Sequence, residues 1–583
     1  MRALDANVLI PVRFRTFSYA QLAATGTVAL VLVMVALPIV VLVFTSFRLT
    51  EDKLPFEDTI FTLQNYRGLL AAGKTYTVLL NTLWYALGAV GAGFTLAMVF
   101  SWLFERTNIP FRSIMIVLLL APMAIPSIVK TMGWILLLNP VNGTFNVLLR
   151  DWTGAAGPGP VNIYSLTGMM LVSGIGMVPS IYVLVSHVFA RFDVRLEESA
   201  RASGATAATT FRRITVPLLR PALLTGAIFY FVNTLDNFEG PALLGMPRDI
   251  FVFSTYIYRS LRTVSALPNY GLTSAFAMVL LALAAVLVVF YARSVRHAER
   301  FAVVTGKGYR PSLINLGHWR WLALALVVLY FSISALLPLA IVLWASLSPG
   351  FSVPSLSGLA EATTARYVKL AHSEIFHKAL MNTLLVTTAT ATATTLLSAV
   401  VAWIAVRQRS IWGKLADWLP FINLANPSII LASALLFFFV GIPLPIYGSN
   451  WIIIIGLIMA YLPYGTRIMG PAYLQIHKEL EEAARISGAS TIQTMIRIVL
   501  PLVKTAVWRG WLWMFIHGTT ATTIPVVLGG IDNQTVTTLL FITLLEEGDL
   551  EMASTMAVPL VVICGLLTLF VARQTLLLRT DTN

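Results

Sequence analysis

Two segments of this sequence combine acidic residues, a glycine and a proline at one repeated spacing. They read LEESARASGATAATTFRRITVPL and LEEAARISGASTIQTMIRIVLPL, 284 positions apart. The residues concerned are Glu198, Ala200, Gly204, Ile214 and Pro217 in the first copy, and Glu482, Ala483, Ala484, Gly488, Ile498 and Pro501 in the second. Acidic residues at a helix start, followed by small residues and a glycine, favour a short surface helix that another protein can approach closely. We predict protein docking here, with each proline opening the next helix.

The composition indicates which elements must position these segments. Of 583 residues, 57% are hydrophobic and 11% are charged, whereas soluble proteins carry roughly 25% charged residues. The chain must therefore face lipid. A single cysteine, Cys564, excludes disulfides within the chain, and the seven histidines form no metal-binding spacing, so no metal site is expected. We attribute the net charge of +14 to cytoplasmic loops and expect no nucleic-acid partner.

Twelve apolar segments are long enough to cross a bilayer as helices. The first is too long for a signal peptide and is expected to remain as a span. We therefore predict an all-α polytopic membrane protein with two parallel six-helix repeats. The spans lie near 21–47, 77–104, 113–138, 164–190, 219–243 and 272–292, and near 320–347, 379–406, 414–440, 450–474, 505–529 and 552–578.

Loop charges predict the orientation. Segments 191–220 and 292–320 each hold six basic residues, whereas 530–551 holds none and five acidic ones. Basic loops stay in the cytoplasm. The two docking loops, 191–218 and 475–502, and both termini are thus expected on the cytoplasmic side of a bacterial inner membrane.

The number of positions between matching residues of the two halves changes along the chain, and this change helps to define the units. Asn81 and Pro126 match Asn382 and Pro427 at an offset of 301, so the first half carries 17 extra residues. The Gly- and Pro-rich stretch 153–162 is the expected extra material, either a tolerated insertion or a docking element on the outer side. We predict one unit over 1–292, a cytosolic linker over 293–319 and a second unit over 320–583.

The repeated loop resembles the EAA loop of permease subunits in ATP-binding-cassette (ABC) importers of the type I fold. The second copy has Glu482-Ala483-Ala484 as that family does, whereas Ser199 departs from it in the first. The resemblance implies that each loop docks one of two cytosolic ATPase subunits, which bind the ATP-Mg. It also implies an extracytoplasmic substrate-binding protein, no cofactor on this chain, and no enzymatic activity of its own. The serine predicts that the two docking contacts are similar but not equal.

Polar residues in the fifth span of each half are candidates for the translocation path, because ionisable groups inside a membrane are costly. The segment NTLDNFEGPALLG matches HGTTATTIPVVLG at the same offset of 284. The candidates are Asn233, Asp236, Glu239, His517, Thr520 and Thr523. Solvation at the outer interface is an equal alternative. Lys130 and Arg467 are expected to snorkel to the interface.

The cargo is less well defined. The stretch NFEGPALLGMPRDIFVFSTYIY and the fused length resemble ferric-iron importer permeases, while related permeases carry thiamine, polyamines or phosphonates. An ion-coupled secondary transporter is a weaker alternative, because it has no reason to repeat the docking loop. A membrane enzyme ranks last. Residues 68–75, GLLAAGKT, match a phosphate-binding loop by letter only, since no strand is expected before them.

Overall fold

A computed structural model describes residues 19–50, 53–57, 60–191, 195–262, 267–299, 313–423 and 426–580. Predicted features at 1–18 and 300–312, including much of the predicted linker, lie outside these ranges. The first half contains α1 (Tyr19–Ser46), α2 (Gln64–Ala71), α3 (Gly73–Arg106), α4 (Arg112–Leu120), α5 (Ser127–Leu138), α6 (Thr144–Thr153), α7 (Leu166–Arg191), α8 (Arg195–Ala202), α9 (Ala207–Thr210), α10 (Val216–Asp236), α11 (Glu239–Leu244), α12 (Phe253–Leu261) and α13 (Tyr270–Glu299). The second half contains α14 (Trp319–Phe331), α15 (Leu337–Leu347), α16 (Leu356–Ala360), α17 (Ala365–Ala371), α18 (Glu374–Arg407), α19 (Ile411–Asn423), α20 (Ser428–Val440), α21 (Asn450–Leu474), α22 (Lys478–Ile486), α23 (Thr491–Thr494), α24 (Leu500–Thr520), α25 (Thr523–Leu528), α26 (Val536–Leu545) and α27 (Leu550–Thr580).

The predicted repeat is confirmed element by element. Helix α18 begins and ends 301 positions after α3, and α24 begins and ends 284 positions after α10. The repeated Asn-Thr pairs hold equivalent loops. Asn81 donates to the Phe251 carbonyl at 3.1 Å, and the Thr82 hydroxyl accepts from the Phe253 N–H at 2.9 Å. In the second half, the Thr383 hydroxyl accepts from the Val536 N–H at 2.9 Å.

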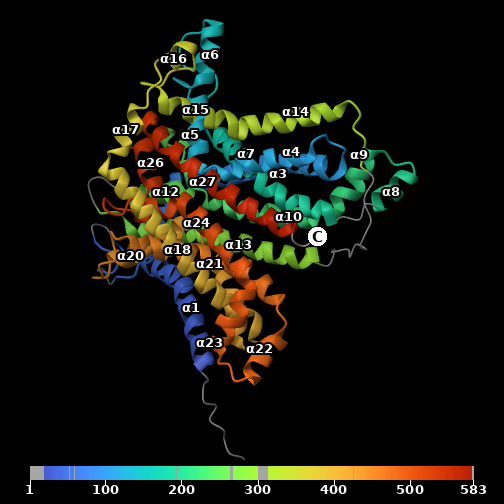
Figure 1. The fold of residues 1–583 in the computed structure, drawn as a ribbon. Helices are drawn as coiled ribbons and strands as arrows, with labels where there is room; N and C mark the ends of the chain where they lie inside the picture. Colours follow the sequence, from blue (N-terminus) through green and yellow to red (C-terminus); the bar gives the residue numbers. More distant parts are fainter. Residues whose placement is uncertain are drawn as a thin grey trace, which may run out of the picture.

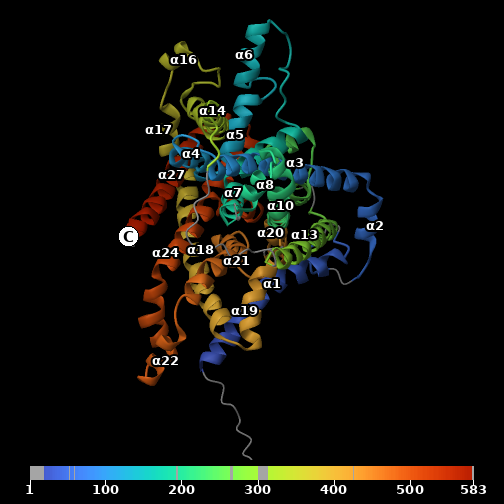
Figure 2. The same cartoon turned by 90° about the vertical axis from the view of Figure 1, so that its right-hand side faces the viewer.

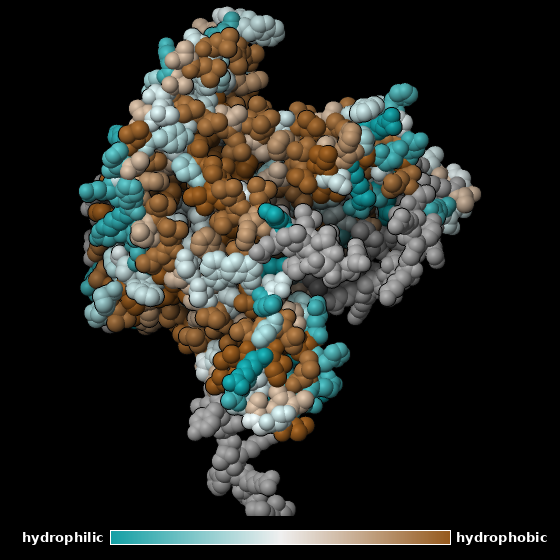
Figure 3. Space-filling view, in the orientation of Figure 1, coloured by the Kyte–Doolittle hydropathy of each residue, from teal (hydrophilic) through white to brown (hydrophobic). Residues whose placement is uncertain are grey.

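The predicted all-helical membrane fold is also confirmed. Within the described ranges, nine helices and two sharply bent pairs are long and apolar enough to cross a membrane. The remaining predicted span, 505–529, corresponds to α24 and α25, which carry Lys504, Arg509 and His517 and are more polar. Figure 3 shows apolar side chains over most of the flank of the molecule, with polar ones at its ends.

Four predicted spans are interrupted, which corrects the prediction of single helices. Segment 113–138 bends by 96° between its two arms, and 414–440 bends by 100°. Pro126 and Pro427 start the second arms in the same extended conformation, because a residue before proline avoids the α region and proline donates no hydrogen bond. Segments 219–243 and 505–529 end their long helices at Asp236 and Thr520, and short helices follow.

The two halves exchange their first helices. Helix α1 packs against α13 of its own half and against α19 and α20 of the other, and α15 packs against α27 and α5 in the same way. Figures 1 and 2 show α1 running down the second half, with α14 and α15 across the first. This exchange ties the halves into one body.

The extra material of the first half is larger than the predicted 153–162. It includes α6, which projects at the top of Figure 1, and the chain returns along it. Asn146 closes the base of this hairpin by donating to the Val161 carbonyl at 2.7 Å and accepting from its N–H at 3.2 Å. The same connection in the second half, between α20 and α21, contains no helix.

Candidate functional site: two docking loops and a polar junction between the halves

Both docking loops contain a short helix that ends in a left-handed glycine. Gly204 follows α8 and Gly488 follows α22, each with φ +87°. Behind them, the Ala205 N–H donates to the Ala200 carbonyl and the Ala489 N–H to the Ala484 carbonyl, both at 3.0 Å. This is a Schellman cap, which favours glycine because it has no Cβ. The repeated glycine therefore has a structural reason in the loop itself.

In the second loop, one of the residues predicted to dock is buried. Around α22, Glu482 and Ala483 are exposed as expected, but Ala484 is buried at 8% exposure, so the prediction that it faces a partner is wrong. Its neighbour Ile486 is 88% exposed instead. On a helix, residues 484 and 486 point in different directions. Figure 1 shows α8 and α22 projecting at the right and at the bottom, both away from α6.

A buried ion pair anchors the second loop, and sequence reasoning missed it. Arg407 at the end of α18 donates through Nε to Glu481 at 2.6 Å and through a second nitrogen to the Ile476 carbonyl at 2.9 Å. Glu481 precedes the exposed Glu482, so the two adjacent acids face opposite ways. In the first half, Arg106 is likewise buried and donates to the Phe189 carbonyl at 3.3 Å. The sequence does indicate a special role for these arginines, because Arg106 and Arg407 occupy the same position of the repeat, 301 positions apart.

Continuous helical backbone joins each loop to its fifth span. The chain is helical from Ala207 to Asp236 and from Thr491 to Thr520, with π-helical turns at Phe211–Thr215 and Met495–Val499. Pro217 and Pro501 thus lie inside these helices, which corrects the prediction that they open them. Ile214 and Ile498 occupy the π turns. A wider turn before each proline relieves the clash of its ring with the preceding carbonyls.

At the far end of α10, Asp236 bonds to the other half. Its Oδ1 accepts from the Ser428 N–H at 2.5 Å, and its Oδ2 accepts from the Ser428 hydroxyl at 2.9 Å. Ser428 begins α20, which has no side-chain cap of its own. A carboxylate satisfies the unpaired N–H groups at a helix start and favours the helix dipole. Asp236 is therefore a cap between halves rather than a solvated interfacial residue.

Glu239 occupies the corresponding place at the other bent span. The hydroxyls of Thr522 and Ser127 lie close to its carboxylate, and Ser127 begins α5. Lys130 is its charged neighbour and also donates to the Pro122 carbonyl at 3.3 Å. Lys130 is half-buried and bonds within the bent segment, and its expected snorkelling to the interface stays a prediction. Arg467 is exposed and lies 3.6 Å from Asp417.

Aromatic side chains of the second half line the same junction. The Tyr461 hydroxyl donates to the His517 carbonyl at 3.0 Å, and this side chain lies near Asp236 and Glu239. The Trp513 ring stacks on His517 with centroids 3.9 Å apart. Tyr461 thus links His517 to the neighbourhood of the two acids, and the role of these three residues in a translocation path stays a prediction.

The remaining candidates contribute less to the junction. Asn233 donates to the Phe229 carbonyl at 2.8 Å, one turn back on its own helix. The Thr520 hydroxyl likewise donates to carbonyls of α24, and Thr523 begins α25. Both acids come from the first half, and threonines hold the matching positions in the second. The first half therefore supplies the acidic side chains at the junction, and the second half has neutral side chains at the matching positions.

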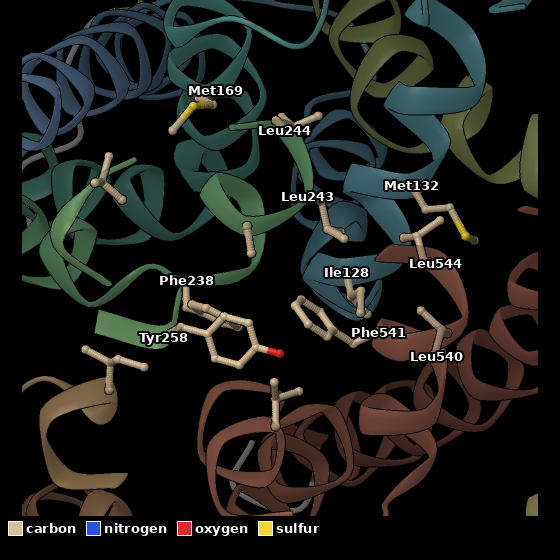
Figure 4. Close-up of a cluster of buried hydrophobic side chains, with 14 of the residues drawn as sticks. Ile128, Met132, Met169, Phe238, Leu243, Leu244, Tyr258, Leu540, Phe541 and Leu544 are labelled. Carbon is tan, nitrogen blue, oxygen red and sulfur yellow. The ribbon is translucent and has the colours of Figure 1, made fainter. Parts of the chain in front are cut away.

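An apolar cluster lies beside this junction (Figure 4). Phe238, in the turn between α10 and α11, has its ring centroid 5.5 Å from that of Phe541 in α26. Tyr258 completes the group at 5.0 Å from Phe238. The cluster fixes the turn that carries Asp236 and Glu239 against the second half.

The segment that matches a phosphate-binding loop by letter only has another structural role. Residues 68–75 form the end of α2, a turn and the start of α3, and no strand precedes them in the part of the chain that the structure describes. The Lys74 ammonium lies 4.9 Å from the centroid of the Phe251 ring. A phosphate-binding loop needs a strand before it and a helix after it.

Comparison with known proteins agrees with this construction. A family model described as "Binding-protein-dependent transport system inner membrane component" matches residues 89–300 and again 394–580. The ferric transport system permease protein FbpB of Actinobacillus pleuropneumoniae is 24% identical over 70% of this chain, and the putative FbpB 1 of Haemophilus influenzae is 24% identical over 64%. This chain spans 58% of the length of each of these two relatives.

Two further similarities cover less of the chain. The spermidine/putrescine permease PotB of Escherichia coli is 28% identical over 37% of this chain and 78% of its own length. A solved bacterial ABC transporter for alginate import shares 16% identity over 44% of this chain and 94% of that one, with a TM-score of 0.36. Since the family model matches each half separately and the two matches together cover most of the sequence, the chain belongs to the family of binding-protein-dependent transport system inner membrane components, with two such units in one chain.

Proposed function

We propose that this chain forms the complete translocation path of an ATP-driven importer, with one cytosolic ATPase subunit docked at each of α8 and α22. The proposal rests on an arrangement of helices that occurs twice in the chain, 284 positions apart. A glycine-capped helix leads through a π turn into helical backbone that ends at Asp236 or at Thr520. Uninterrupted helix transmits a displacement of the loop to the junction between the halves.

The proposed orientation places both loops and both termini in the cytoplasm, following the basic residues of 191–220 and 292–320. The opposite face, with the α6 hairpin, would then receive the extracytoplasmic binding protein. One solved relative is a bacterial alginate ABC transporter in complex with its substrate-bound periplasmic protein. The ATPase subunits would bind the ATP-Mg, and this chain would bind no cofactor.

We favour ferric iron as the cargo, because the two ferric relatives match a larger share of this chain than the polyamine permease does. Two half-buried carboxylates, Asp236 and Glu239, supply the oxygen groups that a hard cation prefers. A polyamine is the second candidate, since Tyr461 and Trp513 lie beside these acids and aromatic faces attract organic cations. Thiamine and phosphonates are less supported, and an ion-coupled secondary transporter least.

Uptake by proteoliposomes tests both parts of the proposal. The chain would be reconstituted with its ATPase and its binding protein, and loaded binding protein would be supplied outside with ATP inside. We expect ATP-dependent uptake of ferric iron, with no response to an imposed proton or sodium gradient. Gradient-driven uptake without ATP would overturn the importer mechanism. ATP-driven uptake of putrescine, with none of iron, would overturn only the cargo.

A further inference from the structure

A groove of about 630 Å³ lies between α3, α10 and α13 of the first half. One side comes from the face of α3 that carries Leu87, Gly91 and Met98, and the other from α10, with Leu287 of α13 at its edge. Every residue that lines the groove is apolar except Arg220. These three helices all belong to membrane-crossing segments, so the groove opens where lipid surrounds the protein.

Arg220 gives the groove a polar end. Its side chain is exposed, and within the described part of the chain no carboxylate forms an ion pair with it. The lining of α10 runs from Val216 to Phe231, which corresponds to about 22 Å of helix at 1.5 Å per residue. One leaflet contributes about half of a hydrocarbon core of roughly 30 Å. The groove is therefore long enough to span about one leaflet. Its positive charge, Arg220, lies near the end of α10 that leads to the docking loop.

The second half closes the same place with its own side chains. Ala227 and Gly91 line the groove, and the equivalent positions hold Trp511 and Thr392. There the Trp511 indole N–H donates to the Thr392 hydroxyl at 3.1 Å. The Trp511 ring also stacks between Trp508 and Phe515, with centroids 5.4 Å and 5.1 Å away. The groove is open because Ala227 and Gly91 are small. The equivalent positions in the second half hold the larger Trp511 and Thr392.

We propose that this groove binds an anionic phospholipid, with one acyl chain along α3 and α10 and its phosphate at Arg220. An arginine without a carboxylate partner selects a negative headgroup, and the apolar walls suit a hydrocarbon chain. The phosphate oxygens accept hydrogen bonds from the guanidinium group. Because Trp511 and Thr392 fill the equivalent place among the described residues of the second half, we expect this groove to bind one lipid. The inference does not depend on the cargo or on ATP.

The test measures lipid retained by the purified full-length chain. After delipidation in mild detergent, the protein is offered phosphatidylglycerol and phosphatidylethanolamine at equal concentration, and bound lipid is counted by native mass spectrometry. We expect the wild-type chain to retain one phosphatidylglycerol preferentially. R220Q should reduce that preference by about fivefold, since one basic residue near a lipid surface contributes about 1 kcal/mol.

The chain itself supplies the matched variants. G91T/A227W copies the Thr392–Trp511 pair into the first half and should abolish retention of either lipid. K504Q changes the position equivalent to Arg220 in the half where Trp511 bonds to Thr392, and should bind lipid as the wild type does. An unchanged preference in R220Q, full retention by G91T/A227W, or equal retention of both lipids by the wild type would overturn the proposal. R220Q alters an exposed side chain, so it decides the headgroup question even if the double variant does not fold.

Discussion

Arg407 and Glu481 form a buried ion pair, with Nε 2.6 Å from Oε1, and their side chains are 8% and 4% exposed. Lys378 and Asp532 form a pair of the same 2.6 Å length whose side chains are 56% and 83% exposed. Equal distances thus occur in two very different environments. A buried charge cannot lose its partner without a large cost, whereas an exposed pair contributes little. The buried pair therefore holds α22 to the end of α18.

Replacing Glu481 with glutamine should disconnect the second docking loop from the membrane helices. The change leaves the Arg407 charge buried without its partner, which costs about 3–5 kcal/mol. We expect a lower melting temperature, together with ATP hydrolysis that continues while uptake falls. D532N is the matched control and should leave both measurements near the wild type. Similar effects of the two variants would show that burial of the pair is not what matters.

Gly204 and Gly488 allow a test of why the loops contain glycine. Each has φ +87°, and a Cβ placed on either would meet no atom within 4 Å in this chain. Asparagine tolerates the left-handed conformation, whereas valine does not. We expect G204N/G488N to retain most ATPase binding and G204V/G488V to lose it, as measured by co-purification. Loss in both variants would instead indicate that the ATPase approaches the glycine too closely for any side chain.

The sequence predicted the repeat and the spans well, because hydropathy and fixed offsets are properties of short segments. It missed the bends at Pro126 and Pro427, since the residues on both sides are apolar and a hydropathy window cannot detect a change of direction. It missed Arg407 because an arginine at the end of a span looks like an ordinary cytoplasmic charge. It also missed the proximity of Lys130 to Glu239, because Glu239 lies more than a hundred positions later in the sequence.

Asp236 should determine passage of a cationic cargo. In D236N, the amide oxygen can still accept from the Ser428 N–H, so α20 keeps a cap while the negative charge is removed. We expect an unchanged melting temperature and uptake reduced at least tenfold. S428A removes only the hydroxyl bond at 2.9 Å and should cost about 1 kcal/mol of stability, with uptake largely kept. If D236N transports at the wild-type rate, Asp236 is only a structural cap.

Phe541 should control how firmly the junction holds together. Its ring lies against Phe238 and Tyr258 of the first half, with centroids 5.5 Å and 5.9 Å away, and it is fully buried. Truncating a buried phenylalanine to alanine costs about 3–5 kcal/mol, because it removes apolar contacts and leaves a cavity. We expect F541A to lower the melting temperature and to reduce uptake, because the turn that carries Asp236 and Glu239 loses its support.

The matched control for this cluster is Phe570, a residue of α27 that is 47% exposed. F570A removes the same side chain from a position that contacts few protein atoms, so its melting temperature should stay near that of the wild type. F541L keeps most of the buried volume and should fall between the two. If the cluster only fills space, F541A will have a lower melting temperature but wild-type uptake per folded molecule. The proposed support of the turn requires uptake per folded molecule to fall as well, because Asp236 would no longer be held against Ser428.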